Sequence, residues 1–304
     1  MGDFKEKKEV LVKNTRKRKN KKRKKLIYNI IIIILCSVLV FCIYNIISYF
    51  LQDFRNENLN GDLAGDYVSY PDDTVSADVS DESAGSGGGP KKEVVVPESI
   101  DFEKLKAQNK DVVGWIFSKN GVINYPILQG KDNSYYLNHL INGKKNINGS
   151  IFMDYSSRSD FSGANTIIYG HSMDNGSMFR TLLNYKKQSY YNKYPEMYIF
   201  TPSGKYKLVI FAAYETNSND MAYGRIIGEA GMNKYISHTF AKSKIKTDVQ
   251  VGVGDNIVTL STCAYSSNDA RFIVAGKLVK DGESADENAN AETNSGYYDS
   301  LFKR

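Results

Sequence analysis

The sequence predicts a mainly β protein whose folded part is a closed or nearly closed β-barrel of about eight strands. From residue 112 onward, apolar runs of strand length recur, and turn-forming residues separate many of them. Only two stretches of the folded part have the apolar spacing of a helix. Many short strands with few helices are typical of a barrel. The predicted strands cover residues 112–117, 123–128, 150–153, 166–169, 197–201, 206–214, 256–263 and 272–279.

Two helices are predicted around these strands. One covers residues 99–110, where Ser99 suits the N-cap position and apolar residues follow at helical spacing. The other lies within residues 226–243, where the pattern changes from alternating to helical. We therefore expect one helix before the first strand of the barrel and one in the loop that precedes the strand 256–263.

Positive charge is concentrated at the N-terminus. Residues 1–25 carry thirteen Lys or Arg and three acidic residues, although the net charge of the whole chain is only +6. The rest of the chain is therefore acidic. A basic run of this kind can bind nucleic acid, but the apolar segment that follows it favours a cytoplasmic tail beside a membrane. We expect no nucleic-acid partner.

Residues 26–51 predict a transmembrane anchor. They contain no charged residue and are long enough to cross a hydrocarbon core of about 30 Å as a helix. Because the basic tail directly precedes them, the positive-inside rule places the N-terminus in the cytoplasm and the remainder of this single-pass chain outside the cell membrane. A cleaved signal peptide is the alternative, but the apolar stretch is long for one and no A-x-A site follows it closely.

Two polar segments flank the folded part. Residues 52–97 are acidic and contain a Gly-rich run, and they hold too few apolar side chains to offset the entropy of ordering. They predict a flexible stalk. Residues 281–304 predict a disordered tail for the same reason. One folded domain, residues 98–280, lies between them and has ordinary single-domain size.

Cys263 ends a predicted strand and is the only cysteine outside the apolar segment. A solitary thiol in an extracellular domain is buried and inert, paired with another chain, or kept reduced for chemistry. A reactive thiolate needs a base or a positive neighbour. His171 follows the strand 166–169 after a glycine, where a substrate can reach it. Arg271 begins the next strand, so an antiparallel hairpin would place it opposite Cys263, where a guanidinium can hold an oxyanion.

Other residues near these motifs are candidates for contact with a substrate or with the site. Ser261 shares a strand face with Cys263 by alternation, so its hydroxyl is placed to contact a substrate. We also assign substrate binding to Thr262 and Tyr169, with strand packing as the alternative. Asp269 orients Arg271 or His171, or it keeps the loop soluble. The sequence contains no zinc, phosphate-binding or calcium-binding pattern, so we expect no metal and no cofactor.

These motifs resemble the sortase family, the membrane-anchored cysteine transpeptidases of Gram-positive bacteria. The resemblance covers residues 98–280 and depends first on TLSTC (259–263) with an arginine eight positions later. YGHSM (169–173) lies about ninety residues upstream. Four further segments are similar to class B sortases in particular: DVVGWI (111–116), INYP (123–126), QGKDNSYYL (129–137) and GSIFMD (149–154).

The resemblance implies a sortase-type closed β-barrel with a helix in the loop before the cysteine strand. It implies Cys263 as nucleophile, His171 as general acid and base, and Arg271 as the group that stabilises the transition state. It further implies that a surface protein or pilin is cleaved after the threonine of a C-terminal sorting motif, through a thioester. The acceptor would be an amine of lipid-linked peptidoglycan or of a pilin. Motifs similar to NPQTN or NPxTG are typical of class B.

Two other functions fit the same residues. An extracellular Cys/His peptidase would use the thiol for hydrolysis. Papain-like enzymes, however, place the cysteine before the histidine and at the start of a helix, whereas His171 precedes Cys263 here. A membrane-anchored binding module without activity would leave the placement of His171 and Arg271 beside the thiol as a coincidence.

Overall fold

The computed structural model describes residues 2–71, 94–264 and 269–282, with side chains from residue 21 onward. The chain divides into two compact units, Met1–Gln52 and Asp53–Arg304. Most of the predicted C-terminal tail and the Gly-rich part of the predicted stalk lie outside the described residues. The boundaries that we assign to the tail, anchor, stalk and folded domain therefore stay predictions.

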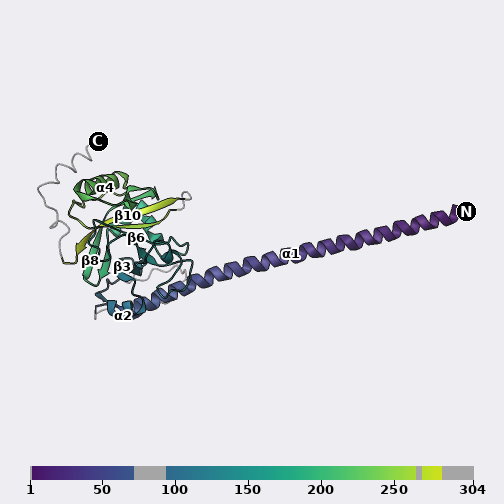
Figure 1. Cartoon of the computed structure of the whole chain (residues 1–304), viewed down its shortest axis with the longest axis horizontal. Coiled ribbons are helices and arrows are strands. Elements are labelled where there is room, and N and C mark those ends of the chain that lie inside the picture. Colours follow the sequence, from purple (N-terminus) through teal and green to yellow (C-terminus); the bar gives the residue numbers. More distant parts are fainter. Residues whose placement is uncertain (1, 72–93, 265–268, 283–304) are drawn as a thin grey trace. The chain divides into compact units, whose positions relative to one another are not determined.

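The N-terminal helix α1 (Gly2–Tyr67) contains the predicted anchor (Figure 1). Within Lys21–Tyr67, an 18-residue window has a mean hydropathy of 3.0, and none of that window is buried in protein. An apolar helix whose surface no protein covers fits a membrane anchor.

Eight strands close into the predicted barrel, in the order β10-β8-β7-β3-β4-β5-β6-β9. Neighbours are antiparallel except for the pairs β4–β5 and β6–β9, which are parallel. Every predicted strand is present, with ends that shift by at most three residues. The strands are β3 (Val112–Ser118), β4 (Asn124–Leu128), β5 (Ile151–Met153), β6 (Asn165–Tyr169), β7 (Glu196–Thr201), β8 (Gly204–Asn217), β9 (Ile257–Cys263) and β10 (Ala270–Lys280).

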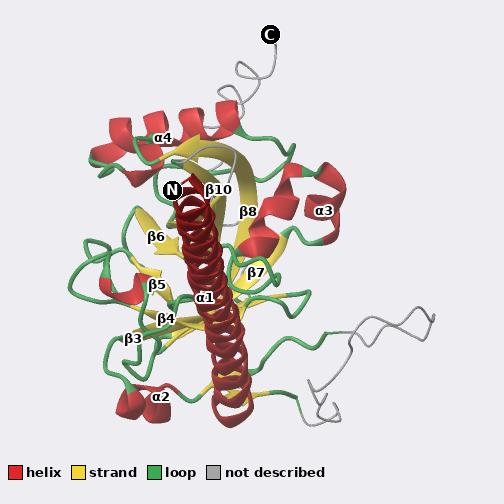
Figure 2. Ribbon diagram, turned by 90° about the vertical axis from the view of Figure 1, so that its right-hand side faces the viewer, coloured by secondary structure: helices red, strands yellow, loops and turns green. Residues whose placement is uncertain are grey.

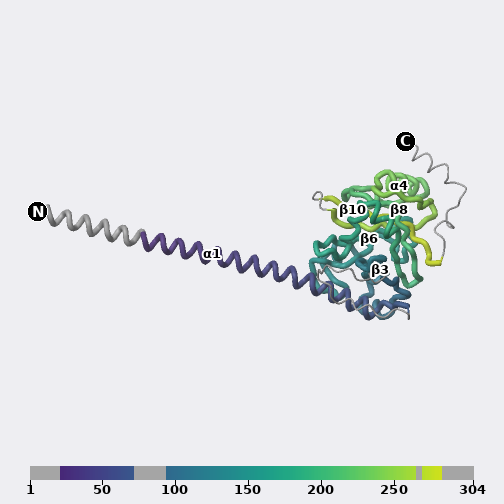
Figure 3. Tube along the Cα trace, turned by 180° about the vertical axis from the view of Figure 1, so that it is seen from behind, coloured from purple at the N-terminus to yellow at the C-terminus, as the bar shows by residue number. Residues whose placement is uncertain are grey.

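Short helices cover the barrel. The predicted helix before β9 is α4 (Gly228–Lys242), which lies beside β8 and β10 (Figures 2 and 3). Its buried residues Met232, Tyr235 and Ile236 belong to one apolar cluster with residues of β8 and β10. The predicted helix before β3 is α2 (Phe102–Gln108), which lies toward the other end of the barrel in Figure 2. The remaining helices are α3 (Gln188–Lys193) and the 3-10 turns η1 (Tyr135–Leu137), η2 (Arg180–Lys186) and η3 (Met221–Tyr223).

The N-cap of α2 differs from the prediction. Ser99 lies in β2 (Ser99–Ile100), which pairs with β1 (Val68–Ser69). The cap is Asp101, whose carboxylate accepts a hydrogen bond of 3.0 Å from the backbone N–H of Lys104. Aspartate caps a helix as well as serine does, and the pairing of β2 decides between the two.

The structure also differs from the expected flexible stalk at residues 53–67. These residues continue α1 as a helix. Leu63 is buried, and Leu59, Ala64 and Tyr67 pack on the same apolar cluster, which includes Trp115. A helical stripe of this kind is stabilised by the surface it covers rather than by its own composition.

A buried carboxylate joins α4 to the barrel. The side chain of Asp220 is only 1% exposed and accepts hydrogen bonds of 2.6 Å from both Lys242 of α4 and Thr216 of β8. His238 of α4 and Tyr214 of β8 lie 3.1 and 3.2 Å from it. Burial alone would raise the pKa of Asp220, but the hydrogen bonds from Lys242 and Thr216 lower it well below its ordinary value. The ionised carboxylate is therefore the form that holds α4 in place.

We expect Asp220→Asn to lower the free energy of unfolding by about 2 kcal/mol at neutral pH. The substitution removes the charge of the carboxylate, and hydrogen bonds to a charged group contribute about that much stability. Since the pKa of Asp220 is lowered in the folded state, its stabilisation is complete above a pH of about 4 and is lost as the pH falls below that value. Denaturant unfolding at pH 7 and pH 3 checks both statements.

Asp248→Asn, at an exposed aspartate, is the matched control and is expected to leave stability unchanged. A difference between wild type and Asp220→Asn that stayed constant from pH 7 to pH 3 would contradict the ionised-carboxylate explanation.

Candidate active site

Cys263 and Arg271 lie directly opposite each other where β9 ends and β10 begins. The antiparallel register pairs their Cα atoms, and one step further the N–H of Ala264 donates to the carbonyl of Ala270 at 3.0 Å. Side chains of directly opposed residues are neighbours, with Cβ atoms about 5 Å apart. The facing position predicted for these two residues is confirmed. Their chemical roles stay predictions.

The strand β6 brings His171 to the same end of the sheet. It runs parallel to β9, with Tyr169 beside Ser261. His171 lies two residues beyond Tyr169, just as Cys263 lies two residues beyond Ser261. The imidazole Nε2 is 2.7 Å from the carbonyl oxygen of Leu137. Because a carbonyl only accepts, Nε2 donates this bond, and Nδ1 is the nitrogen that remains for proton transfer.

Among the described residues, no direct hydrogen bond links the Cys263 thiol to the other two candidate catalytic residues, His171 and Arg271. The thiol is free and partly exposed. The strands therefore bring the three residues to one place, while the imidazole is engaged with Leu137.

The candidate site faces outward from the barrel. Alternate residues of β9 and β10 fill the barrel interior: Val258, Leu260, Phe272 and Val274. Since successive side chains of a strand point to opposite faces, Cys263 and Arg271 belong to the outward set. Ile273 of that set packs with α4. The loop and helix between β8 and β9 therefore form one wall above the thiol.

Arg271 is paired with Asp269. Its side chain is 31% exposed, with Nη2 at 3.5 Å from Oδ1 of Asp269. The carboxylate also accepts bonds from the hydroxyl and the N–H of Ser218 at 2.7 and 3.1 Å, and these bonds lower the pKa of Asp269. Asp269 thus contacts Arg271, and its role in orienting the guanidinium stays a prediction. A partly exposed pair of this kind contributes little stability. Nη1 of Arg271 also donates to the carbonyl of Ala270 at 3.2 Å.

Tyr223 of η3 covers the end of β9. Its hydroxyl is 2.7 Å from Oγ of Ser261, and its ring stacks on Tyr169 with centroids 6.3 Å apart. Burial raises the pKa of Tyr223 to about 12, although the Ser261 hydrogen bond and the charge of Arg271 act in the opposite direction. The phenol is therefore neutral at pH 7 and lies close enough to Arg271 to feel its charge.

The predicted substrate-binding residues lie deeper than expected. Ser261 and Thr262 are each 2% exposed. The Thr262 hydroxyl is buried without a hydrogen-bond partner among the residues that the structure describes. Ser261 lies beneath Tyr223, so direct contact with a substrate requires Tyr223 to move. Their assignment to substrate binding stays a prediction, and Tyr223 is the more accessible candidate on this wall.

Asp154 fixes Tyr169. The Tyr169 hydroxyl donates to Oδ2 of Asp154 at 3.0 Å. Burial alone would raise the pKa of Asp154, but hydrogen bonds from Ser156, Asn133 and Tyr169 bring it below its ordinary value. Burial and the Asp154 charge raise the pKa of Tyr169. Tyr169 is therefore a fixed, neutral part of the wall beside β9.

The other two histidines have structural contacts. His139 stacks on Tyr135 with ring centroids 4.0 Å apart, and His238 binds Asp220. No cluster of three or more His, Cys, Asp or Glu residues that could hold a metal ion occurs in residues 21–71, 94–264 and 269–282.

Three parts of the site were not predicted from the sequence: Tyr223, Asp154 and the carbonyl of Leu137. Tyr223 is one of 22 tyrosines and belongs to no motif. Asp154 and Leu137 lie at the ends of the segments GSIFMD and QGKDNSYYL. Those segments were recognised by resemblance, which was the only available signal, and it did not say what either residue contacts.

Comparison with known proteins agrees with this geometry. The sortase domain family matches residues 118–279. The protein named Sortase B from Staphylococcus aureus (strain NCTC 8325 / PS 47) is 42% identical over 183 residues, which are 59% of this chain and 75% of that protein. A solved Staphylococcus aureus sortase B–substrate complex is 40% identical with a TM-score of 0.56, over 59% of this chain and 84% of the other. A structure of sortase B complexed with triglycine is 41% identical with a TM-score of 0.56. The match covers 59% of this chain and 85% of the other.

We expect Gly170→Ala to displace His171. A Cβ at residue 170 would lie 2.5 Å from Cδ1 of Ile151 and 2.7 Å from the ring of Phe179, whose N–H binds the carbonyl of His171. Overpacking of this kind costs about 1–3 kcal/mol. The loss should appear in the free energy of unfolding, and the imidazole resonances of His171 should shift in an NMR spectrum.

Gly163→Ala is the matched control, because a Cβ there meets only one atom, at 3.9 Å. Unchanged stability and unchanged His171 resonances in Gly170→Ala would mean that the close approach at residue 170 does not constrain the histidine.

Proposed function

The chain belongs to the sortase family of cysteine transpeptidases, and we propose that it cleaves a protein substrate after the threonine of a C-terminal sorting motif and transfers the acyl group to an amine. The observation that carries this proposal is the register of β9, which has Arg271 opposite Cys263 on one side and the strand of His171 on the other. The names of the two similar structures, one with a substrate and one with triglycine, support a peptide donor and an amine acceptor.

In the first step, the Cys263 thiolate attacks the carbonyl carbon of the threonine. A C–S bond forms, and the carbonyl oxygen takes up negative charge, which the Arg271 guanidinium stabilises. When this intermediate collapses, the peptide C–N bond breaks and His171 gives a proton to the leaving amine. The acyl group remains on Cys263 as a thioester.

In the second step, an amine attacks the thioester. A new C–N bond forms, the C–S bond breaks, and His171 takes the proton from the attacking nitrogen. The thiolate and the protonated imidazole are regenerated, so the cycle needs neither an oxidant nor a cofactor. Water in place of the amine would give a carboxylic acid, which is the outcome for a Cys/His peptidase.

The substrates follow from the same proposal. The donor is a surface protein or pilin that bears a sorting motif, and the acceptor is an amine of lipid-linked peptidoglycan or of a pilin. The apolar part of α1 anchors the enzyme as a single-pass membrane protein. The basic tail before it supports a cytoplasmic N-terminus and an extracellular catalytic domain at a Gram-positive cell wall.

Mass spectrometry of products tests this function. The full chain in detergent micelles is incubated with a library of C-terminal sorting peptides, with and without triglycine or hydroxylamine. We expect cleavage after threonine and a shift of product from acid to amide when the amine is present. Cys263→Ala should remove all turnover without loss of the fold, because no thioester can form.

Three outcomes separate the alternatives. Products that are always the free acid would favour hydrolysis. Turnover that survives in Cys263→Ala would remove this thiol from the mechanism. Absence of cleavage of any peptide by a correctly folded wild type would favour a binding module.

We expect Arg271→Lys to lower kcat/KM by about 100-fold, because a point-charge ammonium does not reproduce the planar donors that hold the oxyanion. The measurement is steady-state kinetics on the best library peptide. Arg158→Lys, at an exposed arginine paired with Asp160, is the control and should leave the rate unchanged. A near-normal rate for Arg271→Lys would mean that Arg271 is only a surface charge.

A further inference from the structure

The loop that carries His171 contacts the end of α1. We call residues 170–179 the histidine loop and residues 53–67 the distal turns of α1. The distal turns pack on the barrel through Leu63, which is 2% exposed, and through Asn56, which is 1% exposed. Both segments belong to the same compact unit of the chain. A buried asparagine needs polar partners. The oxygen of Asn56 accepts a bond of 3.1 Å from Asn60 of the same helix, and its amide nitrogen faces Met178 of the histidine loop.

Acidic residues of the distal turns bind the tip of the loop. Nδ2 of Asn175 donates to Oδ2 of Asp53 and to Oε1 of Glu57, both at 2.8 Å. The other oxygen of Asp53 accepts a bond of 2.7 Å from the buried Asn148. Asp53 therefore connects the loop tip to the body of the barrel, and hydrogen bonds to a charged carboxylate are the stronger kind.

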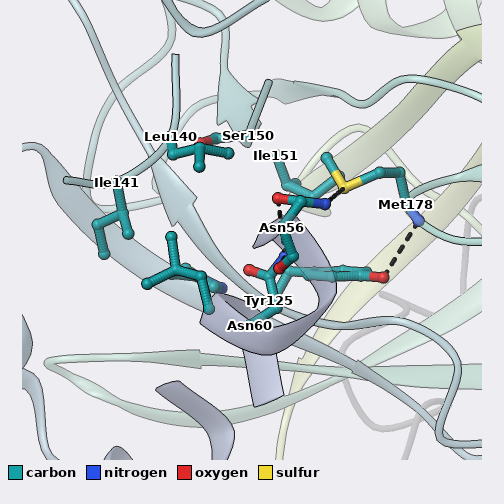
Figure 4. A pocket seen from close by; sticks show the side chains of 10 residues that line it. Asn56, Asn60, Tyr125, Leu140, Ile141, Ser150, Ile151 and Met178 are labelled. Carbon is teal, nitrogen blue, oxygen red and sulfur yellow. Dashed lines mark hydrogen bonds between the residues drawn. The ribbon is translucent and has the colours of Figure 1, made fainter. Parts of the chain in front are cut away.

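Asn56 binds the base of the loop. Its Nδ2 lies 3.9 Å from the sulfur of Met178, and the N–H of Met178 donates to the Tyr125 hydroxyl at 3.1 Å (Figure 4). Met178 has a φ of 56°, in the left-handed region that costs energy for a residue with a side chain. Such a conformation persists only where the surroundings hold it, and Asn56 and Tyr125 are part of those surroundings.

The base of the loop is joined to His171 by a short path. Met178 forms a bridge with Ser172, and the N–H of Phe179 donates to the carbonyl of His171 at 2.8 Å. The N–H of Gly170 donates to Ser261 of β9. The residue before His171 is thus bonded to β9, and His171 itself is bonded to Phe179, the neighbour of Met178.

We propose that the distal turns of α1 hold the histidine loop in its active position, with Asp53 and Asn56 as positioning residues that act on His171 through Asn175 and Met178. This inference rests on the proposed role of His171. It makes the segment after the apolar helix a part of the active enzyme rather than a spacer. A misplacement of about 1 Å at a reacting group costs on the order of 100-fold in rate, so loosening of the loop should be visible in kcat.

The test uses the full chain in detergent micelles with the best library peptide and triglycine. Asn56→Ala, Asp53→Ala and Asn175→Asp are compared with wild type. Asn175→Asp keeps the oxygen that accepts from Ser177 but turns a carboxylate toward Asp53 and Glu57. We expect each variant to lower kcat by about 10-fold with KM changed less than twofold, because the substrate-facing wall is untouched.

Asn58→Ala, at an exposed asparagine of the same turns, is the matched control and should keep the wild-type kcat. The double variant Asp53→Asn/Asn175→Asp exchanges donor and acceptor. It should recover part of the lost kcat, because the new amide at position 53 donates to the new carboxylate at position 175 while its oxygen still accepts from Asn148. A role in general stability alone would not give such a recovery.

Hydrogen exchange gives a readout that does not depend on turnover. We expect amides of residues 171–179 to exchange about 10-fold faster in Asn56→Ala and Asp53→Ala than in wild type or Asn58→Ala. Unchanged exchange together with unchanged kcat would overturn the inference. Faster exchange in a protein without transpeptidation would show that the distal turns hold the loop while the proposed function fails, and it would overturn the catalytic part of the inference.

Discussion

The position of β9 between β6 and β10 is the constraint on which the candidate site depends. β9 is parallel to one neighbour and antiparallel to the other. The parallel neighbour ends at the same edge, so the residue that follows it arrives beside the end of β9. The antiparallel neighbour begins at that edge, so its first residues face the last residues of β9. A slip of one residue in either pairing would turn a side chain of the site to the opposite face.

The distal turns of α1 extend this constraint beyond the sheet. The backbone of His171 leaves the ladder after Tyr169, and its position is no longer set by strand pairing. The contacts of Asp53 and Asn56 hold the chain after Tyr169, where strand pairing no longer holds it. The wall on the other side is held by the ionised Asp220, which joins β8 and α4 around Tyr223. Polar groups that are buried and fully paired specify one arrangement of their surroundings.

The sequence predicted the barrel well because its strands alternate or are bounded by turn residues, and that signal is local. It did not predict the helical distal turns. Their composition is polar, and their apolar stripe of Leu59, Leu63 and Tyr67 is meaningful only against a surface that the sequence does not display. Ser99 was wrong as an N-cap for a similar reason, since pairing with β1 removes it from the helix.

The site was predicted in part. The facing pair Cys263 and Arg271 followed from a short hairpin, in which sequence separation decides spatial position. Tyr223 comes from a loop about forty residues upstream of Cys263, and no pattern marks it. The burial of Ser261 likewise depends on that loop, because strand alternation gives the face of a residue but not what covers it. Thr262, by contrast, shares the interior face of β9 with Val258 and Leu260.

The outward orientation of Cys263 and Arg271 has a consequence for how this protein can diversify. In β9, neighbouring positions belong to different environments, since Val258 and Leu260 fill the interior while Thr259 and Ser261 bind tyrosines of the covering loop and helix. Substitutions at residues 259 and 261 alter the outer wall of β9 and leave the interior volume of the barrel unchanged. Substitutions at residues 258 and 260 are limited by that interior volume. Paired changes at residues 259 and 261 and in the segment that covers them are therefore a route by which evolution can remodel the surface beside Cys263 on an unaltered scaffold.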